Sequence, residues 1–399
     1  MTTLSLCMIV KNEEQFLEQC LNSVKNLVDE IIIVDTGSID KTKEIASKFT
    51  EKIFDFQWCD DFSAARNESL KHATKDWILI LDADELVTKE EYLKIKEAIS
   101  NAEVGGYSIL TKNYSLNSSL SGWQSCSPGK YTFNFPGWYP SVKIRLFRNK
   151  KNFYFIGRIH EMIKFDTEEK LDFPLLLVAI HHYGELKDSE GKKKEYLRLL
   201  IKKVEENPND AKAHFELGVQ YKEKEENNLA EKELKLSVEL NPLPVEPRLN
   251  LALVQQRQNN YKEAKKNYLS LLEKPLPMFI ASEVLFGLGM CFFCELDLIQ
   301  AANYFKKVIQ LNPSSLDAYV NLGAIYEKQG FYDKAQAELS KALQLSPQNP
   351  RTYYNLGVLH EKQLHLELAL RCYQRALELD YVKEGLKERI EKIKLLLRD

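Results

Sequence analysis

The sequence predicts an α/β domain with a doubly wound, mixed sheet, followed by an all-α array of helical repeats. From Met1 to about Ala98, short apolar runs alternate with helical patterns, which is typical of a parallel sheet. Residues 107–183 then carry β-rich segments separated by turns such as Ser127-Pro128-Gly129. From about Ala211 onward, a pattern of large and small residues recurs at the spacing of helical repeats.

The alternation in the first part assigns strands and helices in turn. Four apolar runs predict strands over Leu4–Val10, Glu30–Asp35, Lys52–Trp58 and Trp77–Asp82. Apolar residues at helical spacing predict helices over Glu13–Val24, Asp40–Phe49 and Phe62–Ala73. Because a helix separates each strand from the next, we expect the strands to lie parallel, with their carboxyl ends at one edge of the sheet.

Composition and charge exclude several classes of protein. The net charge is −3 and the basic residues are dispersed among acidic ones, so we expect no nucleic-acid partner. No run of 18 or more apolar residues exists, and Leu4–Val10 lacks the basic leader of a signal peptide, so no integral membrane association is expected. The seven cysteines are scattered and odd in number, which favours free thiols in a reducing compartment and a cytoplasmic protein.

The second half contains five sequence repeats. Large–small pairs recur at intervals of 34, 37, 34 and 34 residues: Leu217-Gly218, Leu251-Ala252, Leu288-Gly289, Leu322-Gly323 and Leu356-Gly357. An alanine follows each pair at a constant offset: Ala230, Ala264, Ala301, Ala335 and Ala369. Small residues at these places let paired helices pack closely, and the pattern resembles the tetratricopeptide repeat.

The repeat pattern also sets the expected domain limits. The second unit departs from it, with Ala252 in place of the glycine and a three-residue insertion after Pro275-Leu276-Pro277-Met278, where we expect a local irregularity. The amphipathic stretch Leu386–Leu397 predicts a capping helix. We therefore expect a sheet domain over 1–185, a connecting helix over 186–210, five repeats over 211–383 and a cap over 384–399.

The most informative functional feature is the fourth predicted strand, which ends directly in Asp82-Ala83-Asp84. Open α/β sheets bind ligands at the carboxyl ends of such central strands. Two carboxylates that converge there favour a divalent cation with oxygen ligands, Mg²⁺ or Mn²⁺. Such an ion is a natural partner for a diphosphate.

Two further loops follow strands that should neighbour this one. The first contains Asn12 and Glu13, and the second begins at Asp35 and continues in Thr36-Gly37-Ser38, which predicts a tight turn. Arg66 lies on the helix before the fourth strand, and its planar guanidinium could bind a base or a diphosphate in the same crevice. The residues alone leave two alternatives open: Asp35 as a turn residue and Arg66 in a surface ion pair.

Together these segments resemble family 2 glycosyltransferases of the GT-A fold. The matching motifs are I-V-K-N-E-E from Ile9, V-D-T-G-S-x-D from Val34, A-R-N from Ala65 and D-A-D from Asp82. The resemblance covers Met1 to about Glu85 and implies a nucleotide-sugar donor, usually UDP-linked. It implies that Asp35 and Arg66 lie near the uracil, Asp82 on the ribose or the metal, and Asp84 on the metal, with Asn12 and Glu13 in the donor-binding set.

Downstream segments extend this resemblance. Family 2 members with D-F-S-x-A-R-N, here Asp61 to Asn67, carry segments similar to three others in this chain: R-x-F-R from Arg145, G-x-x-H-E ending at Glu161 and H-x-G from His182. The sublancin-type peptide S-glycosyltransferases, which also have a helical repeat region, are one such group. An inverting transfer needs a base on the acceptor and a metal on the leaving diphosphate. We expect Glu161 to be the base and His182 to complete the metal shell.

Structural roles remain open for the same residues. Glu161 could instead pair with Arg158 or Lys164. His181 and His182 could be strand residues with satisfied hydrogen bonds.

The repeats suggest where an acceptor would bind. One residue before the large–small pair, three units carry asparagine: Asn250, Asn321 and Asn355. Repeats of this kind present a concave groove, and an asparagine amide can both donate to and accept from an extended peptide. Asparagine is also the ordinary residue at this position in this repeat family, so the three asparagines could be present without binding an acceptor.

Three hypotheses follow. In the first, the chain is a metal-dependent, inverting glycosyltransferase that moves a sugar from a UDP-sugar to a peptide or protein held by the repeats. In the second, the acceptor is a saccharide or a lipid-linked molecule, and the repeats bind partner proteins. In the third, the chain is a catalytically silent scaffold, which the intact Asp82-Ala83-Asp84 disfavours.

Overall fold

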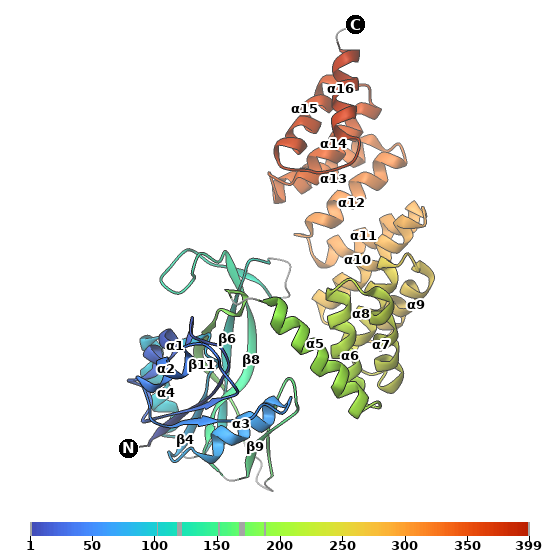
Figure 1. Cartoon of the computed structure of the whole chain (residues 1–399). Helices are drawn as coiled ribbons and strands as arrows, with labels where there is room; N and C mark the ends of the chain where they lie inside the picture. The colour runs from blue at the N-terminus through green and yellow to red at the C-terminus, as the bar shows by residue number, and fades with distance from the viewer. Residues whose placement is uncertain are drawn as a thin grey trace. The chain divides into compact units, whose positions relative to one another are not determined.

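The computed structural model describes residues 2–101, 103–117, 122–150, 152–166, 172–186 and 189–397, without the side chains of 189, 190, 192 and 193. The chain forms two compact units, Met1–Lys203 and Val204–Asp399. Figure 1 shows the first in blue to green and the second in green to red. The fold is an α/β domain followed by helical repeats, as the sequence predicts.

The first unit is built on a mixed sheet that has nine strands among the described residues, in the order β3-β2-β1-β4-β8-β6-β11-β5, with β7 paired to β8. The strands are β1 (Leu4–Val10), β2 (Glu30–Asp35), β3 (Ile53–Asp55), β4 (Trp77–Ile80), β5 (Glu85–Val87), β6 (Gly106–Ser115), β7 (Gln124–Ser125), β8 (Gly137–Arg148) and β11 (Leu175–His182). Strands β1 to β4 pair in parallel, whereas β8 is antiparallel to both β4 and β6. A separate hairpin joins β9 (Phe153–Ile156) and β10 (Met162–Phe165).

Helices cover both faces of this sheet (Figure 1). They are α1 (Leu17–Val24), α2 (Thr42–Ser47), α3 (Phe62–Lys71) and α4 (Tyr92–Ile99), with short 3-10 turns at Lys89–Glu91 and Gly184–Leu186. Because side chains alternate along a strand, Leu6 and Met8 of β1 pack in the core with α1, α2 and α4, whereas Cys7 packs in the core beneath α3. The parallel strands β1, β2 and β4 are thus buried on both sides.

The predicted strands match best where the chain is most apolar. β1 and β2 have the predicted bounds, but α1 begins at Leu17 instead of Glu13. The reason is that the backbone N–H of Glu13 donates to Thr42 Oγ1, and residues 13–16 form a turn instead of helix. β3 is shorter than expected because only Ile53–Asp55 pair with β2.

The second unit consists of helix pairs. The helix α5 (Ser189–Glu206) spans the boundary between the units. The pairs are α6 (Ala211–Glu223) with α7 (Asn227–Leu240), α8 (Val245–Arg257) with α9 (Tyr261–Leu272), α10 (Met278–Cys294) with α11 (Leu298–Leu311), α12 (Leu316–Lys328) with α13 (Tyr332–Leu345), and α14 (Pro350–Lys362) with α15 (Leu366–Glu378). Helix α16 (Leu386–Leu396) follows them.

Close helix packing requires glycine in two of the large–small pairs. A Cβ on Gly218 would lie 2.7 Å from Leu234 Cγ, and one on Gly323 would lie 2.7 Å from Leu339 Cγ. The irregularity expected after the second pair is present as a longer helix, because α10 has 17 residues. The predicted limits 1–185, 186–210, 211–383 and 384–399 stay predictions, since the boundary between the compact units falls inside α5.

Two observations bear on the environment of the protein. Within the described part of the chain, no helix is both long enough and apolar enough to cross a membrane. All seven cysteines are free thiols. The cytoplasmic location stays a prediction.

Candidate active site

The sheet topology brings most of the predicted site residues to one edge. Strands β1, β2 and β4 are parallel neighbours, so Asp35 and the residues that follow β1 and β4 share an edge. β8 is antiparallel to β4, β6 is antiparallel to β8, and β11 is parallel to β6. β11 therefore runs in the direction of β4, and its last residue, His182, lies at the same edge.

Asp35 has one carboxylate oxygen held by the protein and one left over. The side chain is 1% exposed. Its Oδ2 accepts the backbone N–H groups of Gly37 and Ser38, each at 3.0 Å, and lies 3.6 Å from Lys43 Nζ. Its Oδ1 is buried and has no hydrogen-bond partner among the described residues. A buried acceptor without a donor is costly, so this atom is suited to an N–H group of a ligand.

Asn12 and Glu13 fasten the first loop to the second. Asn12 has a φ of 54°. Its backbone N–H donates to Ser38 Oγ at 2.9 Å, and its Oδ1 accepts the N–H of Ile39 at 2.8 Å. The N–H of Glu13 donates to Thr42 Oγ1 at 2.7 Å. These bonds hold the loop around Asp35, and direct binding of a donor by Asn12 or Glu13 stays a prediction.

Arg66 joins two predicted site residues that are distant in sequence. Asp61 caps α3 by accepting the N–H of Ala64 at 3.1 Å, which places Arg66 one turn into the helix. The Arg66 side chain is 5% exposed, and its Nη2 donates to Asp82 Oδ1 while its Nε donates to Glu161 Oε1 at 3.2 Å. Arg66 is therefore in an ion pair, as one alternative had it, but the pair is buried instead of on the surface, and the partner of Glu161 is Arg66.

Two residues that the sequence analysis did not assign complete this charged network. Leu146 pairs with Leu79 in the β8–β4 register, which places Arg145 beside the carboxyl end of β4. Arg145 Nη2 donates to Glu85 Oε1 at 2.7 Å and lies 3.5 Å from Asp82 Oδ2. Glu85 Oε2 accepts the N–H of Asp82 at 2.9 Å. The sequence signals were that Glu85 directly follows Asp84 and that Arg145 begins the R-x-F-R segment.

The two arginines control the charge of these carboxylates. Burial opposes the ionisation of Asp82, but Arg66 and Arg145 outweigh it and hold the pKa of Asp82 well below its usual range. Burial raises the pKa of Glu85; Arg145 counteracts this effect and Asp82 adds to it. Asp82 therefore serves the network as a permanent negative charge between two guanidinium groups.

Asp84 and His182 form the second cluster. His182 Nε2 lies 3.5 Å from Asp84 Oδ2, and its Nδ1 lies 2.8 Å from Asn113 Oδ1. Asn113 Nδ2 donates to Tyr139 O at 3.1 Å and to Ser141 Oγ at 3.0 Å, which fixes Oδ1 toward the histidine. Nδ1 therefore carries a proton and Nε2 faces Asp84. Burial lowers the pKa of His182, but the neighbouring Asp84 outweighs it and the pKa is raised.

These atoms fit a divalent cation. A carboxylate oxygen and an imidazole nitrogen 3.5 Å apart can bind one ion, and the hydrogen bond from His182 Nδ1 to Asn113 is the outer contact that metal-binding histidines typically make. No group of three or more Cys, His, Asp or Glu is arranged as a metal site in the described part of the chain. Mg²⁺ and Mn²⁺ need few protein ligands when phosphate oxygens and water supply the rest. The oxygens of Asp82 face arginines, so the fit favours Asp84 and His182 over Asp82.

Comparison with known proteins identifies the family. The family model described as glycosyl transferase family 2 matches residues 5–165, and a tetratricopeptide repeat model matches residues 314–381. A TPR repeat-containing protein of Synechococcus elongatus is 30% identical over 291 residues, which cover 69% of this chain and 67% of that protein. The chain belongs to the family 2 glycosyltransferases and carries tetratricopeptide repeats.

Two further similarities involve parts of this glycosyltransferase. The SPbeta prophage-derived glycosyltransferase SunS of Bacillus subtilis is 31% identical over 207 residues, which cover 51% of this chain. The chain thus spans 44% of that relative's length. Among solved structures, YrrB, described as a TPR protein with an unusual peptide-binding site, is 20% identical with a TM-score of 0.39, covering 48% of this chain and 97% of that one.

The predicted acceptor residues of the glycosyltransferase lie on first helices of the repeats. Asn250 Oδ1 accepts from Lys222 Nζ at 2.5 Å, and its Nδ2 donates to its own helix at Glu246 O. Asn321 is 1% exposed, accepts from Arg351 and lies near Met290 Sδ.

The third of these asparagines differs from the other two. The side chain of Asn355 is half-buried and has no hydrogen-bond partner among the described residues. Two of the three asparagines are therefore already bound by cations of neighbouring first helices. The binding of an acceptor by these asparagines stays a prediction.

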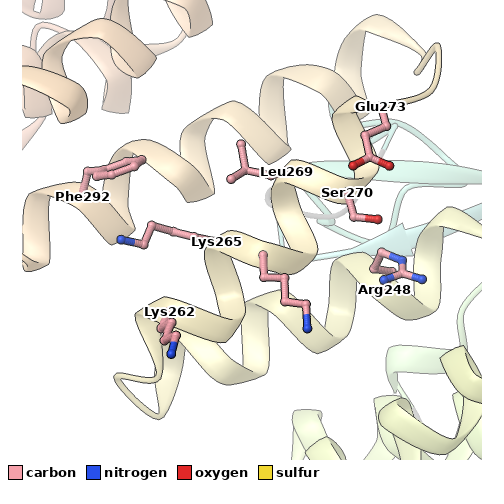
Figure 2. Close-up of a pocket in the computed structure, with 8 residues that line it drawn as sticks. Arg248, Lys262, Lys265, Leu269, Ser270, Glu273 and Phe292 are labelled. Carbon is pink, nitrogen blue, oxygen red and sulfur yellow. The ribbon is translucent and has the colours of Figure 1, made fainter.

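A pocket of about 650 Å³ lies elsewhere on the repeats, between α8, α9 and α10 (Figure 2). Its lining is Arg248, Lys262, Lys265, Lys266, Leu269, Ser270, Glu273 and Phe292. Lys265 pairs with Glu295 and lies 4.5 Å from the centre of the Phe292 ring. The pocket includes none of the predicted site residues.

Proposed function

We propose that this glycosyltransferase moves a sugar, by an inverting displacement that uses Mn²⁺ or Mg²⁺, from a UDP-sugar to a peptide or protein acceptor recruited by its repeats. The observation that carries the proposal is the buried Oδ1 of Asp35, an acceptor without a donor at the edge that also holds Asp84 and His182. The imide N–H of uracil is a donor of the kind that Oδ1 requires.

The donor site is built from side chains at this edge of the sheet. Asp84 Oδ2 and His182 Nε2 would hold the metal, which when bound would neutralise the leaving diphosphate. Arg66 Nη1 and Arg145 Nε are buried N–H groups without partners among the described residues. They are suited to donate to anionic oxygens of the donor, while Arg66 Nε and Nη2 and Arg145 Nη2 stay on the carboxylates of the network.

Glu161 would be the base. Arg66 holds Glu161 Oε1 at 3.2 Å, which fixes the carboxylate and leaves Oε2 to take the proton of the acceptor nucleophile. Arg66 thus links the base to Asp82 at the carboxyl end of β4, so that the donor and the attacking group are positioned by one side chain.

A panel of UDP-sugars tests the donor. We expect slow release of UDP from at least one of them in the presence of Mn²⁺, because many transferases hydrolyse their donor without an acceptor. Asp35→Asn should lower this release on the order of 10- to 100-fold, since an amide in place of the carboxylate disturbs the hydrogen bonds of Oδ2 and Oδ1. Asp55→Asn is the matched control, because Asp55 is 77% exposed and pairs with the same Lys43. Equal effects of the two substitutions would contradict the proposed role of Asp35.

The acceptor is tested separately. Replacing Asn250, Asn321 and Asn355 by alanine should abolish transfer to peptides and spare donor hydrolysis. Unchanged transfer would favour a saccharide or lipid-linked acceptor, with the repeats binding partner proteins. Absence of hydrolysis with every donor tested would favour the silent scaffold.

A further inference from the structure

Two residues of the first unit hold a left-handed backbone conformation directly before a functional residue. Asp60 has a φ of 62° and precedes Asp61, the cap of the helix that carries Arg66. His160 has a φ of 54° and precedes Glu161. Residues with a Cβ rarely adopt this conformation, and it persists only where neighbouring contacts hold it.

Helix α5 contacts both of these residues. Both carboxylate oxygens of Asp60 are bound by the two Nη atoms of Arg198, and Oδ2 also accepts from Lys202 Nζ at 2.8 Å. The Tyr196 hydroxyl is hydrogen-bonded to His160 Nε2, and the two rings meet edge to face with centroids 5.5 Å apart. Arg198 and Lys202 hold the pKa of Asp60 below its usual range.

The geometry makes this contact more than an ordinary surface ion pair. Single exposed pairs contribute little, and the side chains of Arg198 and Lys202 are 49% and 38% exposed. Here, however, a bidentate guanidinium and an ammonium converge on one carboxylate that is only 20% exposed. A planar fork of this kind fixes orientation as well as charge.

The two loops are also tied to each other. Phe62 N–H donates to Arg158 O at 3.0 Å, which joins the start of α3 to the loop that carries His160. Asn67 exchanges two hydrogen bonds with the backbone of Phe155, at 2.9 and 2.7 Å. Helix α3 and the β9–β10 hairpin are therefore hydrogen-bonded to each other. Helix α5 contacts both segments, at Asp60 and at His160.

We propose that Tyr196, Arg198 and Lys202 are positioning residues for the transfer reaction, because they hold the backbone that presents Glu161 and the cap of α3. The inference rests on the proposed role of Glu161 as the base. It also makes α5, the helix that continues past Lys203 into the second unit, an integral part of the active site.

Rescue by glycine separates positioning from general stability. The double variant Arg198→Met with Lys202→Met should lower the kcat of UDP release from the UDP-sugar on the order of 10- to 100-fold. Small misplacements of reacting groups have effects of this size. The affinity for UDP should not change. Adding Asp60→Gly to this double variant should restore most of the kcat, because glycine adopts a positive φ without strain. Arg375→Met, which removes an exposed pair with Glu378 on α15, is the control and should leave kcat unchanged.

A wild-type kcat in the double variant, or no rescue by Asp60→Gly, would overturn the inference. Hydrogen exchange tests it without activity. The amides of residues 59–62 and 157–161 should exchange faster in the double variant and not in Arg375→Met, and unchanged exchange would also overturn it. Glu161→Gln distinguishes the two proposals: a wild-type kcat there would remove the proposed base, while the exchange result would still decide whether α5 holds the loops.

Discussion

At the scale of single residues, several side chains of the site use one polar atom for a hydrogen bond within the protein and present another toward the proposed ligand. Asp35 is held through Oδ2 and available through Oδ1. His182 is held through Nδ1 by Asn113, and its Nε2 faces Asp84. Such groups bind a ligand without first having to be ordered, which lowers the entropic cost of binding.

Asn113 should control metal affinity although it does not contact the metal. Asn113→Ala removes the acceptor of His182 Nδ1, so the ring loses its fixed orientation. Outer contacts of this kind typically change metal affinity 10- to 100-fold, and we expect a loss in this range for Mn²⁺. Calorimetric titration of Mn²⁺ in the presence of UDP measures it. Asn22→Ala, an exposed asparagine bonded to its own helix, is the control, and equal Mn²⁺ affinity in both variants would contradict the prediction.

At the scale of elements, loop and strand ends are fastened by buried polar side chains. Glu30, the first residue of β2, accepts hydrogen bonds from Ser5 of β1 at 2.5 Å and from Thr74 before β4, and it pairs with Lys52 before β3. One carboxylate thus joins the starts of four parallel strands at the edge opposite the active site.

Glu30 should make the stability of the first unit depend on pH. Burial raises its pKa, but the hydrogen bonds from Lys52, Ser5 and Thr74 outweigh burial and lower the pKa from 4.5 to about 2. The carboxylate therefore stabilises the fold fully above pH 4.5, and this contribution is lost as the pH falls toward 2. Glu30→Gln should cost about 3 kcal/mol at pH 7, and the difference from wild type should shrink below pH 4.5.

Tryptophan fluorescence during urea unfolding measures this difference for the first unit alone, because all four tryptophans lie between Trp58 and Trp138. A difference that stays constant from pH 7 to pH 3 would contradict the assignment to Glu30.

Helix packing in the repeats should be sensitive to one added methyl group. In Gly323→Ala the new Cβ would lie 2.7 and 2.8 Å from Leu339 Cγ and Cδ2, so either the Leu339 side chain or the two helices α12 and α13 must shift. We expect a loss of about 1–3 kcal/mol, reduced by the better helix propensity of alanine. Circular dichroism during thermal unfolding measures it. Gln344→Ala, an exposed position on α13, should have little effect, and equal unfolding curves of both variants would contradict the packing argument.

At the scale of the whole molecule, the chain is a glycosyltransferase unit followed by a repeat unit. Both could be predicted from the sequence because their hydrophobic periods differ and each period belongs to one kind of packing. The carboxyl edge of the sheet was predictable for the same reason: β1, β2 and β4 are apolar runs that end in polar residues.

The contacts inside the site could not be predicted in this way. Arg66 meets Glu161 across 95 residues of chain, and Arg145 meets Glu85 across 60. These pairs depend on the antiparallel β8 and on the position of the β9–β10 hairpin, which no local pattern specifies. Asn113 had no sequence signal, because a polar residue in a β-rich segment is usually on an exposed face.

Titration of UDP into the protein by calorimetry, with and without Mn²⁺, tests the proposed donor site most directly. The variants are Asp84→Ala and His182→Ala, with Asp55→Asn as the control. We predict binding that depends on Mn²⁺ in the wild type and the control, and loss of that dependence in both site variants. No binding in the wild type, or equal binding with and without the metal, would contradict a metal-dependent UDP-sugar site at this edge of the sheet.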